Sequence, residues 1–386
     1  MLATTLPLGA LIDKSYRPRH PADDEVWNLN LDQIEPHSGR VLSKCMLSAS
    51  ELGPSTHAFD RGTVLYSKLR PYLNKVVVAD DDGVATTELV PLRCDESRLN
   101  ALYLAHFLRG PDFLRFATNV VAGAKMPRMV MSEFWKFPVP LPPLPEQRRI
   151  AAILDQSDAL RAKRREALAQ LDSLTQSIFI EMFGDPASNP MRWPDSGLGD
   201  SVQLMQYGPR FYDEAYSVDG IRIARITDLS EEGDLDFESM PRMAVTPKDL
   251  TQFALQPGDL IFARTGATVG KVALYRDGNP PCIPGAYFIR MKFKCELTPD
   301  YVATLLKSSS IREMVTLQSR QAAQQNFSGP GLRRLPLPVP PLPLQQIFAT
   351  RIQAVESLKA THRAALAELD ALFASLQHRA FAGQLS

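Results

Sequence analysis

The sequence has no excess of either charge. It contains 43 Lys and Arg residues and 43 Asp and Glu residues, so its formal net charge is zero. A balanced chain gives no support for nonspecific attraction to nucleic acid. Specific binding stays open, because a partner protein can supply the positive field.

Cysteine and long apolar runs are also scarce. The four cysteines lie far apart without a C-x-x-C pair, which argues against a zinc site or a disulfide framework and favours a reducing cytoplasm. No apolar run is long enough to span a membrane, and residues 1–20 lack the pattern of a signal peptide. We therefore expect a cytoplasmic protein with no membrane contact.

The sequence contains no credible catalytic motif. "RTGATVGK" (264–271) resembles a phosphate-binding loop, but only three residues separate its glycines and Val272 stands where Mg²⁺ needs a hydroxyl. "NPPC" (279–282) lacks the aromatic face that an amino-methyltransferase needs to stack a flipped base. The six histidines show no metal-binding spacing. We expect no catalytic residue, no metal and no cofactor on this chain.

What the sequence does contain is an internal repeat. Residues 139–183 align without a gap with residues 337–381, each residue standing 198 positions before its counterpart. Both copies begin with a ladder of prolines, "PLPPLP" and "PVPPLP" at 140–145 and 338–343, and continue as a Gly- and Pro-free stretch rich in Ala, Leu, Glu and Arg. This composition predicts a helix of about 37 residues, roughly 55 Å long, after each proline hinge.

Apolar residues recur in each predicted helix at heptad spacing, which indicates that the two helices bury each other. The predicted seam consists of Ile150, Ile153, Leu160, Ala167, Leu171, Leu174 and Ile178, with Phe348, Val355, Leu358, Ala365, Leu369, Leu372 and Leu376. Two equivalent units favour an antiparallel pair. Arg164 and His362 either face each other near its middle or are two solvated breaks.

The regions before the helices are related too. "GTVLYSKLRPYLNKV" (62–76) matches "GDLIFARTGATVGKV" (258–272), and both indicate strand, basic loop and strand. Residues 99–118 and 297–316 then indicate amphipathic helices. The predicted fold is thus two pseudo-repeated α/β (α+β) domains, joined by two long helices that form an antiparallel coiled coil.

Several loops at matching points of the two repeats carry Arg, Lys, Gln, Asn and Tyr. Arg and Gln can form paired hydrogen bonds to base edges, and basic groups can contact phosphates. Singly these are ordinary surface loops. The candidate DNA-binding residues are Tyr16, Arg17, Arg19, Lys68, Arg70, Lys125, Arg128, Gln206, Tyr207, Arg210, Tyr212, Arg264, Gln321, Gln324, Gln325 and Asn326.

Together, the ladder with its heptad helix and the two strand–loop–strand segments resemble the specificity subunit of type I restriction–modification enzymes. The segment "VWNLNLDQIEPHSGRV" (26–41) is also similar to part of that family's recognition domains. The resemblance covers essentially the whole chain. It implies target recognition domains at 1–137 and 185–335, and a proline hinge with a long helix at 138–184 and 336–386.

The resemblance also implies a non-catalytic subunit that reads one half of a bipartite double-stranded DNA target with each recognition domain. The helices would set the spacer and dock two methyltransferase subunits, and two restriction subunits would complete the complex. S-adenosylmethionine, ATP and Mg²⁺ are then expected on those partners. The candidate docking residues are Glu146, Gln147, Arg148, Arg149, Gln345 and Gln346.

Two other functions remain to be weighed. A coiled-coil scaffold whose globular domains bind proteins would share the same architecture. A self-contained methyltransferase is disfavoured, because no glycine-rich S-adenosylmethionine motif is present. The second ladder also departs from the first, since Glu146, Arg148 and Arg149 have no charged equivalents. We therefore expect docking surfaces of unequal strength.

Overall fold

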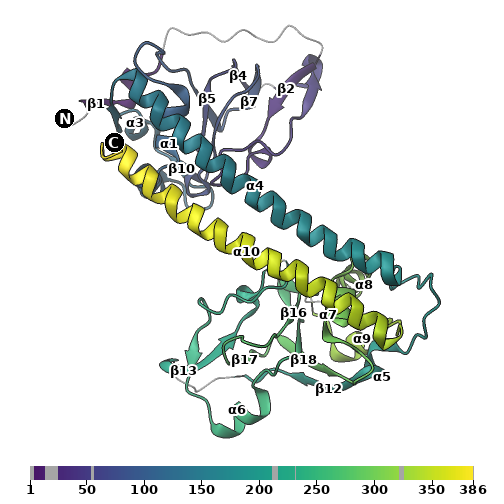
Figure 1. The fold of residues 1–386 in the computed structure, drawn as a ribbon. Helices are drawn as coiled ribbons and strands as arrows, with labels where there is room; N and C mark the ends of the chain where they lie inside the picture. Colours follow the sequence, from purple (N-terminus) through teal and green to yellow (C-terminus); the bar gives the residue numbers. More distant parts are fainter. Residues whose placement is uncertain are drawn as a thin grey trace. The chain divides into compact units, whose positions relative to one another are not determined.

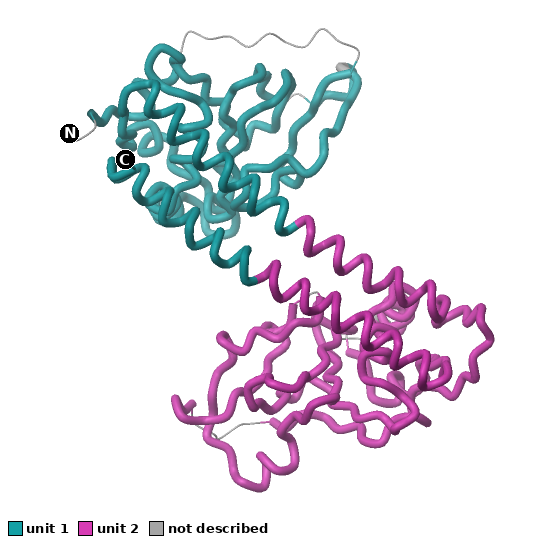
Figure 2. The backbone as a smooth tube through the Cα atoms, viewed as in Figure 1, with its two compact units in different colours: residues 1–165, 364–386 teal, residues 166–363 magenta. Residues whose placement is uncertain are grey.

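A computed structural model of the chain describes residues 4–13, 25–53, 56–210, 216–230, 232–320 and 326–385. The chain divides into two compact units, residues 1–165 with 364–386 (unit 1) and residues 166–363 (unit 2), coloured separately in Figure 2. Both boundaries fall inside long helices. Each unit therefore holds one globular region and half of each long helix.

The described residues of unit 1 form short strands and short α-helices. Its strands are β1 (Thr4–Pro7), β2 (Glu25–Leu29), β3 (Met46–Ser48), β4 (Thr56–Phe59), β5 (Val64–Ser67), β6 (Val76–Val78), β7 (Gly83–Thr86), β8 (Leu89–Leu92), β9 (Val121–Ala122), β10 (Arg128–Met129) and β11 (Pro138–Leu141). Its short helices are α1 (Ala101–Leu108), α2 (Pro111–Asn119) and α3 (Met131–Phe134). The strands form sheets in the orders β3-β2-β7-β4 and β6-β5-β8, with the pairs β1-β11 and β10-β9.

The described residues of unit 2 form a related set of short strands and helices. Its strands are β12 (Val202–Tyr207), β13 (Tyr216–Ala224), β14 (Arg242–Met243), β15 (Leu260–Ala263), β16 (Val272–Leu274), β17 (Cys282–Pro284) and β18 (Phe288–Phe293). Its short helices are α5 (Gly197–Ser201), α6 (Pro247–Phe253), α7 (Pro299–Lys307), α8 (Ser309–Arg320) and α9 (Gly329–Arg333). The sheets have the orders β12-β18-β15-β16 and β14-β13-β17.

The predicted internal repeat extends to strand register. Val64 pairs with Val78 in the β5–β6 hairpin, and their equivalents Leu260 and Leu274 pair in the β15–β16 hairpin. The stretch "RTGATVGK" links β15 to β16, so it joins two strands, as predicted, and does not open a helix. This confirms the strand–loop–strand prediction and removes the phosphate-loop interpretation.

Each predicted amphipathic helix is in fact two helices. In unit 1 the break falls at Gly110, which is extended because the following Pro111 disfavours helical geometry in the residue before it. In unit 2 Ser308 is extended and separates α7 from α8. The sequence pattern predicted one helix at each place because the apolar spacing continues across the break.

The two long helices are α4 (Leu144–Phe183) and α10 (Leu342–Phe381), each of 40 residues. In unit 1, Arg161 of α4 pairs with Asp370 of α10. In unit 2, Asp172 pairs with Lys359 and Phe179 packs on Phe348. In unit 2 the partner's residue number thus falls as the residue number on α4 rises. In unit 1 Arg149 contacts Leu385 and the later Arg161 contacts Asp370, so the two helices run antiparallel in each unit (Figure 1).

The predicted seam is wrong at four leucines. Leu160 and Leu174 of α4 are 46% and 44% exposed, and Leu358 and Leu372 of α10 are 52% and 50% exposed. Lys359, by contrast, is only 5% exposed. Arg161 and Lys359, the residues that follow Leu160 and Leu358, form cross-helix ion pairs with Asp370 and Asp172 within their own units.

Candidate nucleic-acid interface

In both units the loop after the first hairpin strand pairs with a segment that follows the two short helices. Met129 donates its N–H to the Lys68 carbonyl (2.8 Å), and the equivalent Phe327 donates to the Arg264 carbonyl (2.7 Å). Isolated bridges join Leu69 to Arg128 and Thr265 to Asn326. Candidate residues from separate parts of the sequence are therefore brought together twice by the same geometry.

The unit 2 cluster consists of Tyr207, Arg264 and Asn326. The Arg264 guanidinium carbon lies 4.7 Å from the centre of the Tyr207 ring, and Arg264 Nε donates to Asn326 Oδ1 at 3.3 Å. The Tyr207 hydroxyl accepts a hydrogen bond from the Gly329 N–H at 3.0 Å, although the ring stays 44% exposed. This arrangement holds a planar cation in place with its ring support facing solvent, which suits recognition of a base edge or a phosphate.

The unit 1 cluster consists of Lys68, Glu88 and Arg128. Arg128 binds both carboxylate oxygens of Glu88, with Nε at 3.0 and 3.1 Å and Nη2 at 2.8 Å. The hydrogen bonds from Arg128 hold the pKa of Glu88 below its usual value, with Lys68 acting in the same direction. Arg128 is thus present at the predicted place, but a carboxylate already neutralises it.

The sequence analysis missed Glu88. Its signal exists only in three dimensions, because the Lys68 N–H donates to the Glu88 carbonyl just as the Arg264 N–H donates to that of Tyr287. A carboxylate in unit 1 therefore takes the place of an exposed tyrosine in unit 2. The two candidate surfaces differ in charge at matching points.

Other candidates lie on the same loops or outside the described residues. Arg70, Lys125 and Arg210 are exposed, and the N–H of Arg70 donates to the Pro127 carbonyl at 2.7 Å. Gln206 lies on the edge strand β12, and its buried Oε1 accepts no hydrogen bond from any described residue. The candidates outside the described ranges are Tyr16, Arg17, Arg19, Tyr212, Gln321, Gln324 and Gln325.

Two of the docking candidates are used inside the chain. Gln147 accepts from the Asn100 N–H (2.9 Å) and donates to the carbonyls of Arg98 and Pro142, both at 2.9 Å. Gln345 repeats all three contacts in unit 2 with Thr298, Glu296 and Pro340. The side chains are 1% and 0% exposed, so they tie each proline ladder to its own unit and offer no surface to a partner.

The remaining docking candidates are exposed to different degrees. Glu146 and Arg149 form a two-bonded ion pair (both contacts 2.7 Å), and Arg149 also reaches the Leu385 carbonyl at 2.5 Å. The hydrogen bond from Arg149 lowers the pKa of Glu146. Arg148 and its equivalent Gln346 are exposed near the start of each long helix. These two positions best suit a partner surface.

The described residues include no group of three or more His, Cys, Asp or Glu side chains arranged to hold a metal ion. No helix in the same part of the chain combines the length and the apolar character needed to cross a membrane.

Two repeated α/β units, each with half of both long helices and with polar loops at matching points, define a protein with an internally repeated architecture. The family model "Type I restriction modification DNA specificity domain" matches residues 58–170 and 193–371. The chain therefore belongs to the type I restriction–modification DNA specificity family.

Similar proteins include the type I restriction enzyme EcoDI specificity subunit of Escherichia coli, 30% identical over 176 residues. That match covers 44% of this chain and 39% of the relative, so the chain spans well under two thirds of it. The MjaVIII specificity subunit of Methanocaldococcus jannaschii is 23% identical over 72% of this chain and 68% of the relative.

Solved structures share the fold. The S subunit of a type I restriction–modification system from M. genitalium aligns with a TM-score of 0.57 at 13% identity, covering 98% of this chain and 96% of that one. A chain from a study of complex assembly and conformational transition of the type I R-M system gives 0.53 at 19% identity, covering 100% and 98%. The predicted fold class, two repeated α/β (α+β) domains joined by two long helices, is thereby confirmed.

Proposed function

We propose that this chain is the non-catalytic DNA specificity subunit of a type I restriction–modification complex. Each recognition domain, 1–137 and 185–335, reads one half of a bipartite double-stranded target. The observation that carries this proposal is the double match of the family model, once in each half of the chain. The repeated placement of Lys68 with Arg128, and of Arg264 with Asn326, supports one reading surface in each unit.

Within this proposal the loop residues of this chain contact DNA. The chain can have zero net charge because its partner subunits contribute to DNA binding. The Arg264 guanidinium and the Asn326 amide are groups that recognise base edges. Lys68, Arg70, Lys125 and the exposed Arg210 suit phosphates, which position a protein on DNA without reading its sequence. Partner subunits then supply the positive field that this chain lacks.

The long helices are proposed to set the spacer and to dock two methyltransferase subunits. Arg148 and Gln346 stand at equivalent exposed positions, as do Leu160 with Leu358 and Leu174 with Leu372. Exposed leucines at repeated positions suit a protein interface. Two restriction subunits complete the complex, and S-adenosylmethionine, ATP and Mg²⁺ belong to the partners. We infer that such a complex acts in the cytoplasm of a bacterium or archaeon.

The test is to express the chain with its methyltransferase partner and to map adenine methylation across the genome. We expect a single bipartite motif with an unspecified spacer of fixed length. Omitting this chain while keeping the methyltransferase should abolish the motif. If an active pair produces no bipartite motif, the proposal fails and the protein-binding scaffold becomes the better explanation.

A further inference from the structure

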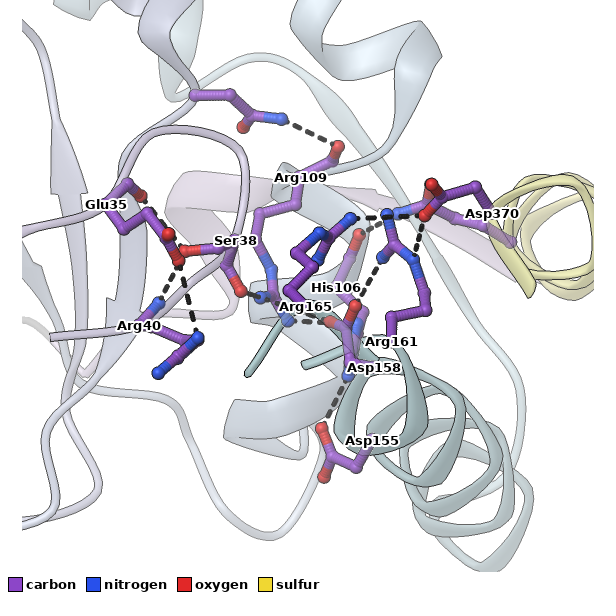
Figure 3. Close-up of polar contacts among 12 residues, drawn as sticks. Glu35, Ser38, Arg40, His106, Arg109, Asp155, Asp158, Arg161, Arg165 and Asp370 are labelled. Carbon is purple, nitrogen blue, oxygen red and sulfur yellow. Dashed lines mark hydrogen bonds and ion pairs between the residues drawn. The ribbon is translucent and has the colours of Figure 1, made fainter. Parts of the chain in front are cut away.

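Four charged side chains of unit 1 form a continuous chain of alternating sign, which we call relay 1: Arg109, Asp158, Arg161 and Asp370. Arg109 Nη1 lies 3.6 Å from Asp158, and Arg161 contacts both Asp158 and Asp370 at 2.5 Å. Figure 3 shows the relay passing from the globular region through α4 to α10. It therefore connects three separate segments of the sequence.

Unit 2 contains a counterpart, relay 2, made of Lys307, Glu356, Lys359 and Asp172. Lys359 contacts Asp172 at 2.6 Å and Glu356 at 2.9 Å, and Lys307 lines the same cavity as these three residues. Relay 2 lies on the wall of a cavity of about 820 Å³ between the globular region of unit 2 and its helices.

The two relays match position by position. Every member stands 198 residues from its counterpart, the same distance as in the proline ladders. Arg109 becomes Lys307, Asp158 becomes Glu356 and Arg161 becomes Lys359, so three residue types change while every charge keeps its sign. What the repeat has kept is therefore the order of charges.

Each relay also ends on the same kind of loop. Arg109 Nη1 donates to the Ser38 carbonyl and Lys307 Nζ to the Glu232 carbonyl, both at 2.7 Å. The next residue in each loop is a glycine with positive φ, Gly39 (+71°) and Gly233 (+89°). A Cβ on Gly39 would lie 1.8 Å from Arg109 Nη1. A Cβ on Gly233 would lie 2.1 Å from the Val272 carbonyl oxygen and 2.5 Å from Lys307 Nζ, so neither loop has room for a side chain beside its cation.

The relays occupy positions at which the apolar seam does not specify register. Leu160 and Leu372 of unit 1, and Leu174 and Leu358 of unit 2, are about half exposed. Arg161 and Lys359 have side chains only 15% and 6% exposed. Partly buried charges add little net stability, but a shift in register leaves them unpaired at high cost, so they discriminate strongly against wrong pairings.

We propose that each relay is a positioning device. It couples the register of α4 against α10 to the position of one recognition-domain loop, the loop at Gly39 in unit 1 and the loop at Gly233 in unit 2. This inference rests on the proposed function for its consequence: relay 1 and relay 2 together fix the number of base pairs between the two half-targets. Neutralising a central cation should loosen that selection without changing which bases are read.

The first experiment uses the full chain alone and needs no DNA. Arg109→Gln, Asp370→Asn and the double variant are compared in thermal unfolding, because these residues stand at opposite ends of relay 1. If the relay is one connected unit, the loss in Tm of the double variant is smaller than the sum of the single losses. Strictly additive losses would overturn the proposal.

The second experiment uses the complex with its methyltransferase and measures methylation of targets whose spacer is native, one base pair shorter or one longer. Arg161→Gln and Lys359→Gln should each raise the ratio of wrong-spacer to native-spacer methylation by about tenfold, as expected for losing a charged contact. Arg161→Lys, which installs the relay 2 residue, should keep the native ratio. Lys163→Gln, an exposed neighbour on α4, is the matched control.

The outcomes separate the two proposals. If the unaltered complex methylates no bipartite motif, the proposed function fails whatever the Tm data show. If it methylates one motif and the Gln variants keep its spacer selection, the relays are structural pairs only and this inference is wrong. Should Arg161→Gln not fold, the triple variant Arg109→Lys, Asp158→Glu, Arg161→Lys decides the matter, because it must retain both folding and the native ratio.

Discussion

At the scale of single residues, the structure gives Gln147 and Gln345 a different role from the one that the sequence suggested. The sequence analysis placed both among the candidate docking residues, near the start of each long helix. Each instead closes three hydrogen bonds inside its own unit. Their identity at the 198-residue offset is a signal the sequence did contain, because buried contacts to backbone groups demand one particular amide.

We expect Gln147→Leu to lower the free energy of unfolding by about 2 to 4 kcal/mol, because it leaves the Asn100 N–H and two carbonyls without partners. Urea unfolding measures the change. Gln156→Leu, on the exposed face of the same helix, should change it by less than about 0.5 kcal/mol. Equal losses in both variants would show that the amide network is unimportant.

The ion pair of Arg128 with Glu88 leads to a second prediction. Glu88→Gln should free Arg128 for a phosphate, so the assembled complex should bind its target more tightly at low salt. The slope of log affinity against log salt should steepen by about one. Fluorescence anisotropy over a salt series checks this. Glu133→Gln, which breaks an exposed pair with Lys136, should leave the slope unchanged, and a shallower slope for Glu88→Gln would contradict the prediction.

His106 makes unit 1 sensitive to acid. Arg109 donates to its Nδ1 (3.0 Å), which leaves Nε2–H to donate to Asp155 (2.6 Å), so the ring is neutral. Burial, first of all, lowers the pKa of His106, and Arg109 adds to this while Asp155 and Asp158 oppose it; Phe373 of α10 packs beside the ring.

Because folding lowers the pKa of His106, there is a pH range below about 6.5 in which His106 is protonated in the unfolded chain and neutral in the folded chain. Stability should therefore fall as pH drops below about 6.5, by at most about 1.4 kcal/mol per pH unit. His106→Gln, which keeps one acceptor and one donor, should flatten the fall measured by urea unfolding between pH 6.5 and 5. The exposed His378→Gln should not flatten it. A fall of the same steepness in His106→Gln would contradict the assignment.

At the scale of elements, the sequence predicted a long helix after each proline ladder and a strand–loop–strand hairpin in each repeat. These elements depend on local spacing and on the positions of Gly and Pro. Sequence periodicity failed to predict which side chains are buried where that depends on contacts between distant segments. The exposed Leu160 and the buried Lys359 both follow from charges that pair across helices. The clusters around Arg264 and Arg128 depend on strand pairing between distant segments, and spacing along one chain does not encode that.

An insertion of one heptad into each long helix, after Arg165 and after Arg363, tests the helices as a ruler. It adds about 10.5 Å, or about three base pairs of DNA. Three base pairs turn DNA by roughly 100°, whereas a heptad turns a helix by only about 20°. We expect the motif spacer to lengthen by about three base pairs, or methylation to be lost through this mismatch.

Methylation mapping of the insertion variant gives the spacer directly. A seven-residue insertion at the exposed turn Asp277–Gly278 is the control, since it leaves both helices unchanged and should keep the spacer. An unchanged spacer in the heptad variant would refute the ruler.

At the scale of the whole molecule, the repeat predicts that the two half-targets are read independently. Replacing Arg210–Tyr212 in the second recognition domain should alter one half of the methylated motif and leave the other half and the spacer intact. Native mass spectrometry of the complex controls for assembly. Loss of assembly would mean that this loop is structural, and a change in both halves would contradict independent reading.

The end of α10 closes the core of unit 1. Phe381 packs against Tyr103 and Phe107 with ring centres 5.4 and 5.2 Å apart, and Ala380 belongs to the same core. Unit 2, by contrast, is built from residues 166–363 alone. During synthesis the chain leaves the ribosome from its N-terminus, and domains ordinarily fold in that order. Here unit 1 begins to be translated first but is completed after unit 2, because its core includes residues 364–386, which are synthesised after all of unit 2.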